Sequence, residues 1–421
     1  MKFQRQQLYE DANCHILLYR LPLVRTKSLF VVYSSREMKN RTVKIWLTST
    51  FCFCAILTSG WIHLPSIQSQ SPEKNPLSKW KPGKDYSGLR YLGSSVCAQC
   101  HPAKVASQSL TPMAQALTLS ADCQILITHP QLEFQQAPYT YQITRKGNRS
   151  IYTVTDGINT ISETILYCFG QGVAGQTYLF QHNGVFYESR VSFYTELQRL
   201  DLTIEHPRSI PSSLEAALGR PMNQEAASGC FACHSTGAVR STQLQLDSLI
   251  PGVTCEACHG PGENHVAAVK STNYKDPQIF NPKKLDALDQ MQEFCGACHQ
   301  SFDTVMLLPE RGGINNLRFQ PYRMANSHSH FINDRRISCV ACHDPHEKLE
   351  HNATYYDRKC LACHLANKKE SKTEERKASA CSVSNQQCIT CHMPKVEVSG
   401  FHYKFTDHWI RIVKPNDKVP Y

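Results

Sequence analysis

The chain has 421 residues and a formal net charge of +10, and it contains 20 Cys and 19 His. Residues 1–75 hold ten Lys and Arg against four Asp and Glu, so this segment carries +6 of the charge and the rest carries +4. Because no basic run or aromatic platform stands out beyond residue 75, the composition gives no support to nucleic-acid binding. The Cys and His residues are therefore the feature to explain.

The N-terminal segment has the layout of an export signal. Residues 38–44 (MKNRTVK) are basic, and residues 45–64 (IWLTSTFCFCAILTSGWIHL) are mostly apolar. Translation from Met38 would make residues 1–37 an upstream tail or a misassigned start. The apolar run, about 20 residues long, can also span a bilayer. We therefore predict that residues 38–64 are a signal peptide or, in preference, an N-terminal membrane anchor, with the following chain outside the cytoplasm.

Residues 65–90, which are rich in Pro, Ser and Lys, are predicted to be a linker. Seven copies of Cys-x-x-Cys-His come after it. Their Cys residues are Cys97 and Cys100, Cys230 and Cys233, Cys255 and Cys258, Cys295 and Cys298, Cys339 and Cys342, Cys360 and Cys363, and Cys388 and Cys391. Their His residues are His101, His234, His259, His299, His343, His364 and His392.

This spacing fits the covalent attachment of a c-type haem. Two thiols can add to the two vinyl groups of one porphyrin, and the adjacent imidazole can bind its iron. Pairs of Cys also form zinc ribbons, but zinc does not require a His after each pair. Chance predicts only about 0.04 copies of the motif in this composition. The sequence thus predicts seven covalently bound haem c groups, with the seven motif His residues as proximal iron ligands.

The chain between the first and second motifs has a different character. Residues 91–130 are predicted to be the first haem-binding segment, with a helix after His101. In residues 131–205, polar residues alternate with aromatic or β-branched ones, and Asn183-Gly184 is a strong hairpin signal. We predict a small antiparallel β-subdomain here, inserted after the first haem motif.

The remaining six motifs lie close together in residues 206–412. From Cys230 to His392 the six motifs share 163 residues, about 27 for each, so an ordinary hydrophobic core cannot form and the porphyrins should take its place. We therefore predict a six-haem domain here, followed by a C-terminal tail at residues 413–421. The predicted fold class is a mainly α and irregular multihaem fold with sparse secondary structure, plus the β-subdomain.

The second axial ligand of each iron decides whether that haem carries electrons or binds a substrate. His265 follows a Gly-Pro-Gly turn that lets the chain double back. His346 is too close in sequence to His343 to bind the same iron, so it should reach a neighbouring one. The full set of distal candidates is His265, His346, His408, His402, one of His328 and His330, Met113 and His129. The other downstream His residues, His182, His206 and His351, are expected to be ordinary surface or loop residues.

Six Cys residues lie outside the motifs. Three of them, Cys14, Cys52 and Cys54, belong to the N-terminal segment. For Cys123, Cys168 and Cys381, two interpretations stay open: one disulfide with one free thiol, or three buried free thiols.

Three segments carry a resemblance to a known family. CEACHGPGENH at residues 255–265, CVACHDPH at 339–346 and the ending CITCHMPK with FTDHWIR are similar to multihaem cytochromes of the cytochrome c-552/4 type. That group includes the nitrifier tetrahaem electron-transfer cytochrome, and the likeness covers residues 90–412. It implies an extracytoplasmic, haem-rich fold with His265, His346 and His408 as distal ligands. The nitrifier protein has four haems and no β-insert, so its partners do not carry over.

Two functions follow from this sequence. The preferred one is electron transfer between donor and acceptor proteins in the periplasm or an equivalent compartment, with residues 45–64 as an optional anchor in the inner membrane. The alternative is an oxidoreductase of the nitrite reductase, hydroxylamine oxidase or tetrathionate reductase type with one open iron. The first motif is the best candidate for an open iron, with Lys104, Gln108 and Tyr139 as polar neighbours. No catalytic residue is assigned.

Overall fold

The computed structural model describes residues 80–83, 85–272, 274–308, 314–327, 336–364, 381–414 and 416–420. These residues all belong to one compact unit. The predicted signal peptide or anchor at residues 38–64 and the ligand candidates His328 and His330 lie outside the described residues. Within the described ranges, no helix is long and apolar enough to cross a membrane.

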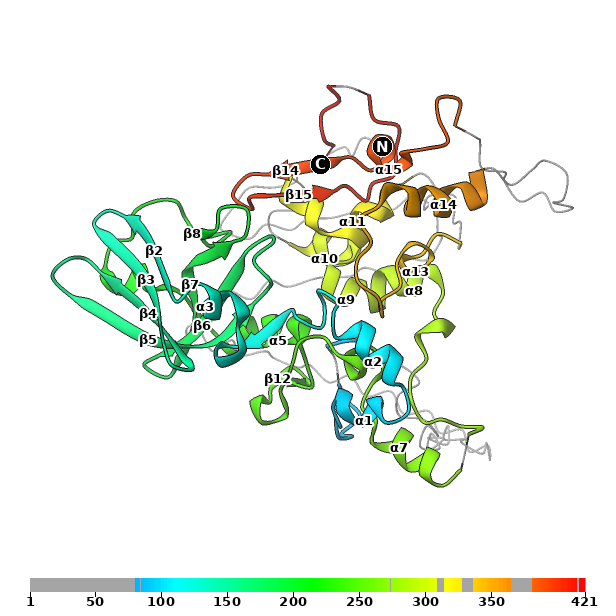
Figure 1. Ribbon diagram of the computed structural model, residues 1–421, viewed down its shortest axis with the longest axis horizontal. Coiled ribbons are helices and arrows are strands. Elements are labelled where there is room, and N and C mark those ends of the chain that lie inside the picture. Colours follow the sequence, from blue (N-terminus) through cyan, green and yellow to red (C-terminus); the bar gives the residue numbers. More distant parts are fainter. Residues whose placement is uncertain are drawn as a thin grey trace, which may run out of the picture. The chain divides into compact units, whose positions relative to one another are not determined.

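The largest element is a sheet of nine antiparallel strands (Figure 1). The strands are β1 (Leu117–Leu119), β2 (Gln131–Gln136), β3 (Tyr139–Lys146), β4 (Arg149–Thr155), β5 (Thr160–Phe169), β6 (Gln176–His182), β7 (Val185–Tyr194), β8 (Arg199–Leu202) and β9 (Gly219–Met222). Strands β2 to β8 each pair with the next strand along the chain, so they form a meander. In addition, β1 pairs with β5 and β9 pairs with β7.

The prediction of a mainly α and irregular fold with only a small β-subdomain is wrong, because this nine-stranded sheet dominates the described chain. The sheet also takes in β1 and β9, which lie outside residues 131–205. The physical reason is that the strand-forming segments and the haem motifs need different lengths of regular structure. Alternating β-branched and aromatic residues sustain long strands, whereas a Cys-x-x-Cys-His motif needs only one turn of helix.

The predicted hairpin at Asn183-Gly184 is confirmed. His182 pairs directly with Val185, and Asn183 and Gly184 both have positive φ, at 50° and 77°. Two residues with positive φ form the turn type whose twist matches that of the flanking strands. The sequence signal is reliable here because few residues other than Asn and Gly adopt this conformation without strain.

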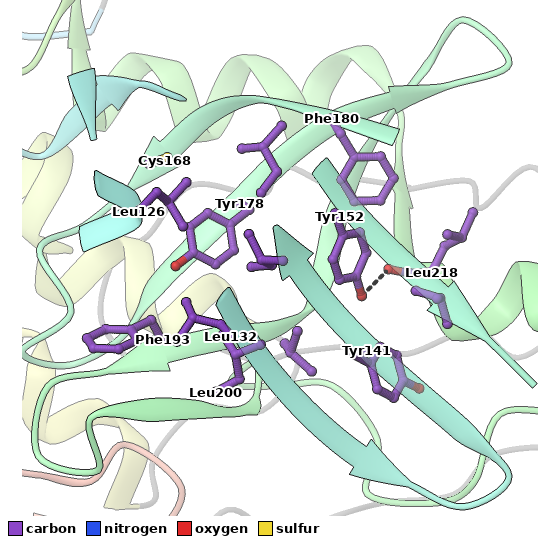
Figure 2. Packing of buried hydrophobic residues seen from close by; sticks show 14 of the residues in the cluster. Leu126, Leu132, Tyr141, Tyr152, Cys168, Tyr178, Phe180, Phe193, Leu200 and Leu218 are labelled. Carbon is purple, nitrogen blue, oxygen red and sulfur yellow. Dashed lines mark hydrogen bonds between the residues drawn. The ribbon is translucent and has the colours of Figure 1, made fainter. Parts of the chain in front are cut away.

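Alternate residues of the sheet point into one hydrophobic core (Figure 2). Tyr141, Tyr152, Tyr178 and Phe180 are each 0% exposed, as expected where every second side chain faces the same side. The Tyr152 hydroxyl donates a hydrogen bond to the Leu218 carbonyl at 3.2 Å. The helices α3 (Gln124–Thr128) and α4 (Leu214–Leu218) contribute buried residues to the same core.

The other helices are short. They are α1 (Ser94–Ala98), α2 (Pro102–Gln108), α5 (Gln224–His234), α6 (Cys255–His259), α7 (Glu263–Lys270), α8 (Ala287–Asp289), α9 (Gly296–His299), α10 (Phe302–Leu307), α11 (Gln320–Ala325), α13 (Cys339–Cys342), α14 (Ala353–His364) and α15 (Cys388–His392). A π-helical turn at Gln290–Phe294 joins α8 to α9. The remaining strands form two-stranded ribbons: β10 (Ser235–Thr236) with β13 (Ile250–Pro251), β11 (Val239–Arg240) with β12 (Gln243–Leu244), and β14 (Lys395–Val398) with β15 (Tyr403–Thr406).

Apolar packing becomes sparse away from the sheet. A second cluster, which includes Phe169 and Phe231, joins β5 to α5. Two further clusters have only three buried members each, which are Trp80, Phe280 and Phe294 in one and Leu317, Val398 and Phe401 in the other. In the described chain after α5, packing between protein side chains alone is therefore limited.

Two of the Cys residues outside the motifs lie in the core of the sheet. Cys123 and Cys168 are 0% exposed, and Cys123 Sγ donates a hydrogen bond to Gln176 Oε1 at 3.1 Å. A hydrogen bond from Cys168 lowers the pKa of the Cys123 thiol to about 7, although burial acts in the opposite direction. Cys381 is exposed, so the interpretation of three buried thiols is wrong for this residue.

Candidate haem-binding sites

The seven motifs are numbered in chain order, from motif 1 (Cys97–His101) to motif 7 (Cys388–His392). Each motif lies on or beside a short helix, and in five of them the His is the last helical residue. One turn of helix places the two Cys residues, three apart, on the same face, and the His four residues after the first Cys joins them there. In these five motifs, the helix thus presents two thiols and an imidazole to one side, whereas His101 and His343 follow the end of their helices.

Cys sulfurs bring motifs that are distant in sequence together. The Sγ atoms of Cys97 and Cys255 lie within hydrogen-bonding reach of each other, and the same holds for Cys233 with Cys298, Cys295 with Cys339, and Cys360 with Cys388. These contacts pair motif 1 with 3, 2 with 4, 4 with 5, and 6 with 7. Helix α13 of motif 5 also contacts α14 of motif 6, and Cys258 and Cys295 of motifs 3 and 4 pack on one apolar cluster. The seven motifs therefore form one continuous but branched series, in which motif 4 lies beside motifs 2, 3 and 5.

Two motif imidazoles face a second His. The ring centres of His259 and His346 are 6.1 Å apart with 24° between the ring planes, and those of His343 and His408 are 6.3 Å apart. An iron bound between two imidazoles, with bonds of about 2 Å and a further ~1 Å from each nitrogen to its ring centre, separates the centres by about 6 Å. The donor residues therefore fit an iron at both places.

In five His residues, a hydrogen bond to the backbone determines which ring nitrogen can bind a metal. Nδ1 contacts a backbone carbonyl oxygen in His234 (Ala116, 3.0 Å), His259 (Phe280, 3.1 Å), His265 (Pro277, 2.6 Å), His392 (Arg411, 2.9 Å) and His408 (Thr406, 3.0 Å). A carbonyl can only accept, so Nδ1 carries the proton and Nε2 has the free lone pair. Metal-binding His residues are oriented in this way in proteins.

Burial favours the neutral form of five imidazoles, four in the motifs and that of His408. It lowers the pKa of His234, His259, His299 and His343, and it lowers the pKa of His408 to about 4. Only the neutral ring offers a lone pair to a metal ion. Each of these five rings is thus in the form that can bind iron.

Other predicted ligands lie elsewhere. His402 Nε2 contacts the Asp201 carboxylate at 2.9 Å, and both ring nitrogens of His129 are in hydrogen-bonding range of acceptors, the Ile125 carbonyl and Gln198 Oε1. Met113 is half-buried in the turn between α2 and β1. The His129 ring packs against Phe193 and the His402 ring against Tyr194, not against a motif His as His346 and His408 do.

The polar residues predicted around motif 1 also have other partners. Tyr139 lies in the core of the sheet and donates to the Pro211 carbonyl, and Gln108 donates to the Val253 carbonyl at 2.8 Å. Lys104 lies 3.8 Å from the carboxylate of Asp344. Gln108 thus connects motif 1 to the chain just before motif 3, and Lys104 connects it to the chain just after motif 5.

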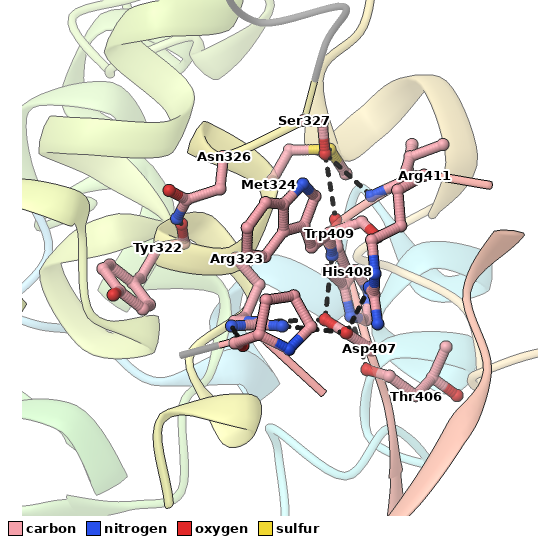
Figure 3. Close-up of polar contacts among 12 residues, drawn as sticks. Tyr322, Arg323, Met324, Asn326, Ser327, Thr406, Asp407, His408, Trp409 and Arg411 are labelled. Atoms are coloured by element: carbon pink, nitrogen blue, oxygen red, sulfur yellow. Dashed lines mark hydrogen bonds and ion pairs between the residues drawn. The ribbon is translucent and has the colours of Figure 1, made fainter. Parts of the chain in front are cut away.

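A buried ionic cluster supports His408 and has no signal in the sequence (Figure 3). Arg323 is 1% exposed and forms a two-pronged ion pair with Asp407 at 2.8 and 2.9 Å, and Arg411 adds a contact to the same carboxylate at 2.6 Å. Burial would raise the pKa of Asp407, but hydrogen bonds from Arg323 and Trp409 outweigh it and lower the pKa. Asp407 precedes His408 directly, so the cluster fixes the chain at a candidate ligand.

Known proteins share parts of this pattern. The family model described as cytochrome c554 and c-prime matches residues 204–260, which contain motifs 2 and 3. Multiheme cytochrome MtrA of Shewanella baltica (strain OS185) is 23% identical over 218 residues, which cover 44% of this chain and 60% of MtrA. The crystal structure of the outer cell wall cytochrome OcwA covers 77% of this chain and 80% of that chain, with 16% identity and a TM-score of 0.44. The sequence match to MtrA covers less than two thirds of the length of MtrA.

The seven motifs, the family model over residues 204–260 and the similarity to MtrA define the class of protein. This chain is a multihaem c-type cytochrome, and its haem is bound covalently.

Proposed function

We propose that this chain binds seven c-type haems and passes electrons from a donor protein to an acceptor protein outside the cytoplasm. Bound haem supplies one-electron chemistry at its iron, and two imidazoles on one iron favour electron transfer over substrate binding. The observation that carries the proposal is the separation of about 6 Å in the His259–His346 and His343–His408 pairs. The continuous series of motif contacts supports a relay through the unit.

The residues of the chain have separate roles in this proposal. The 14 motif Cys residues hold the porphyrins, and the seven motif His residues are the proximal ligands. His346 is the distal ligand opposite His259, and His408 is the distal ligand opposite His343. His265 is a third distal ligand, for the iron of a motif other than motif 3, because its Nδ1 contacts the Pro277 carbonyl and its Nε2 is left with the free lone pair.

The first test counts the haems and determines their spin states. We expect the pyridine haemochrome spectrum and the intact mass to give seven haems per chain, and low-temperature EPR of the ferric protein to show low-spin signals only. A count below seven would contradict the haem assignment. A high-spin ferric signal would contradict a pure electron carrier and favour an oxidoreductase with an open iron.

Haem attachment should depend on residues 38–64. Thioether bonds to haem are formed outside the cytoplasm, so a chain without this segment should lose nearly all covalent haem, seen as loss of haem staining after denaturing gel electrophoresis. A foreign cleavable signal peptide in its place should restore the stain, and deletion of residues 2–37 should leave it unchanged. Full haem staining without residues 38–64 would refute an export role for this segment.

A further inference from the structure

Two buried carboxylates each join a pair of motif helices. Glu256, on the helix of motif 3, is 2% exposed. Its two oxygens accept backbone N–H groups from Leu92 at 2.9 and 3.0 Å, Gly93 at 2.7 Å and Gly262 at 2.8 Å. Gly93 is the residue before α1, the helix of motif 1. One side chain of motif 3 therefore holds the start of the motif 1 helix.

The same arrangement occurs at the other end of the series. Asp357 on α14, the helix of motif 6, is 4% exposed. Its oxygens accept the N–H groups of Gln387 at 2.9 Å and Cys388 at 2.8 Å. Cys388 is the first residue of α15, the helix of motif 7. In both cases, the two helices that share the carboxylate also bring a Cys sulfur of one motif against a Cys sulfur of the other.

These bonds hold both carboxylates in fixed positions. The first N–H groups of a helix have no partner within the helix, so an acidic side chain satisfies them and is favoured there. All four carboxylate oxygens accept hydrogen bonds from backbone N–H groups, and such bonds are strongest when the carboxyl group is charged. Burial would raise the pKa of Asp357, but the N–H bonds of Cys388 and Gln387 outweigh it and lower the pKa.

We propose that Glu256 and Asp357 are positioning residues that set the separation and the reduction potentials of the haems of motifs 1 and 3 and of motifs 6 and 7. This inference depends on the proposed function. Glu256 directly follows Cys255 and lies three residues before His259, and Asp357 lies three residues before Cys360. A fixed negative charge in a buried site favours the oxidised, more positive iron, because electrostatic interactions are less screened there than in water.

The test compares single variants by spectroelectrochemical titration. We expect Glu256→Gln to shift one pair of haems to higher potential and Asp357→Asn to shift a different pair, with the other haems unchanged. The matched control is Glu225→Gln, which removes an exposed carboxylate from the helix of motif 2 and should shift none. Glu256→Asp keeps the charge and should stay closer to the native titration than Glu256→Gln.

The outcomes separate this inference from the proposed function. If the native protein lacks seven haems or shows high-spin iron, the proposed function fails. If the native protein passes and Glu256→Gln and Asp357→Asn retain seven haems with unchanged potentials, the inference fails. It also fails if Glu225→Gln shifts the titration as much. Where Glu256→Gln loses haem from motifs 1 and 3 alone, and Glu256→Asp recovers it, the positioning role is supported by haem content instead.

Discussion

Replacing His408 with Met should leave all seven haems attached and raise the reduction potential of one of them by an amount on the order of 0.1 V. The ring centre of His408 is 6.3 Å from that of His343, the separation expected for two ligands of one iron. A thioether stabilises ferric iron less than an imidazole does, so the ferrous form becomes relatively more stable and the reduction potential rises. Spectroelectrochemical titration measures the shift, and EPR reports the changed ligand set.

The control is His402→Met, a change of the same kind only six residues away. His402 Nε2 already contacts the Asp201 carboxylate at 2.9 Å, so this variant should titrate as the native protein does. His346→Met should shift a different haem, because His346 faces His259. An unchanged titration of His408→Met with seven haems bound, or an equal shift in His402→Met, would refute His408 as a ligand.

The haem-binding motifs could be predicted from sequence alone because the chemistry of attachment is local. Two thiols and an imidazole within five residues are needed, and any such segment is visible in the chain. The partner of His343 is different, since His408 lies 65 positions later and only the fold brings the two together. The resemblance to known cytochromes pointed to His346 and His408, but not to the motif that each one faces.

The fold class was predicted wrongly for a related reason. The hairpin at Asn183-Gly184 depends on two adjacent residues and was found. By contrast, β1 (Leu117–Leu119) and β9 (Gly219–Met222) are held by pairing with β5 and β7, more than 25 residues away. A three- or four-residue strand has too little pattern to be recognised by itself. The pairing of Arg323 with Asp407, 84 positions apart, had no local signal at all.

The ionic cluster beneath His408 should be essential for stability. Asp407→Asn leaves the guanidinium of Arg323, which is 1% exposed, without its counter-ion. Removal of one partner from a buried ion pair typically costs about 3–5 kcal/mol, because the remaining charge is stranded away from water. We expect a loss of this size in thermal or denaturant unfolding of the haem-loaded protein. High-spin iron should also appear below the unfolding transition, as the chain at His408 loosens.

Two further variants determine whether the stranded charge is the cause. Glu263→Gln breaks an ion pair with Arg90, whose side chain is 76% exposed, and should leave the unfolding transition unchanged. Replacing Arg323 and Asp407 together with Leu removes both buried charges, and Arg411, at 17% exposed, can still reach water. This double variant should recover much of the lost stability, because exchanging a buried ion pair for apolar residues often leaves the free energy of unfolding unchanged.

Native-like unfolding of Asp407→Asn would show that the Arg323–Asp407 pair does not stabilise this region. A double variant as unstable as the single one would show that the lost hydrogen bonds, including those to Trp409 and Pro420, cost more than the stranded charge.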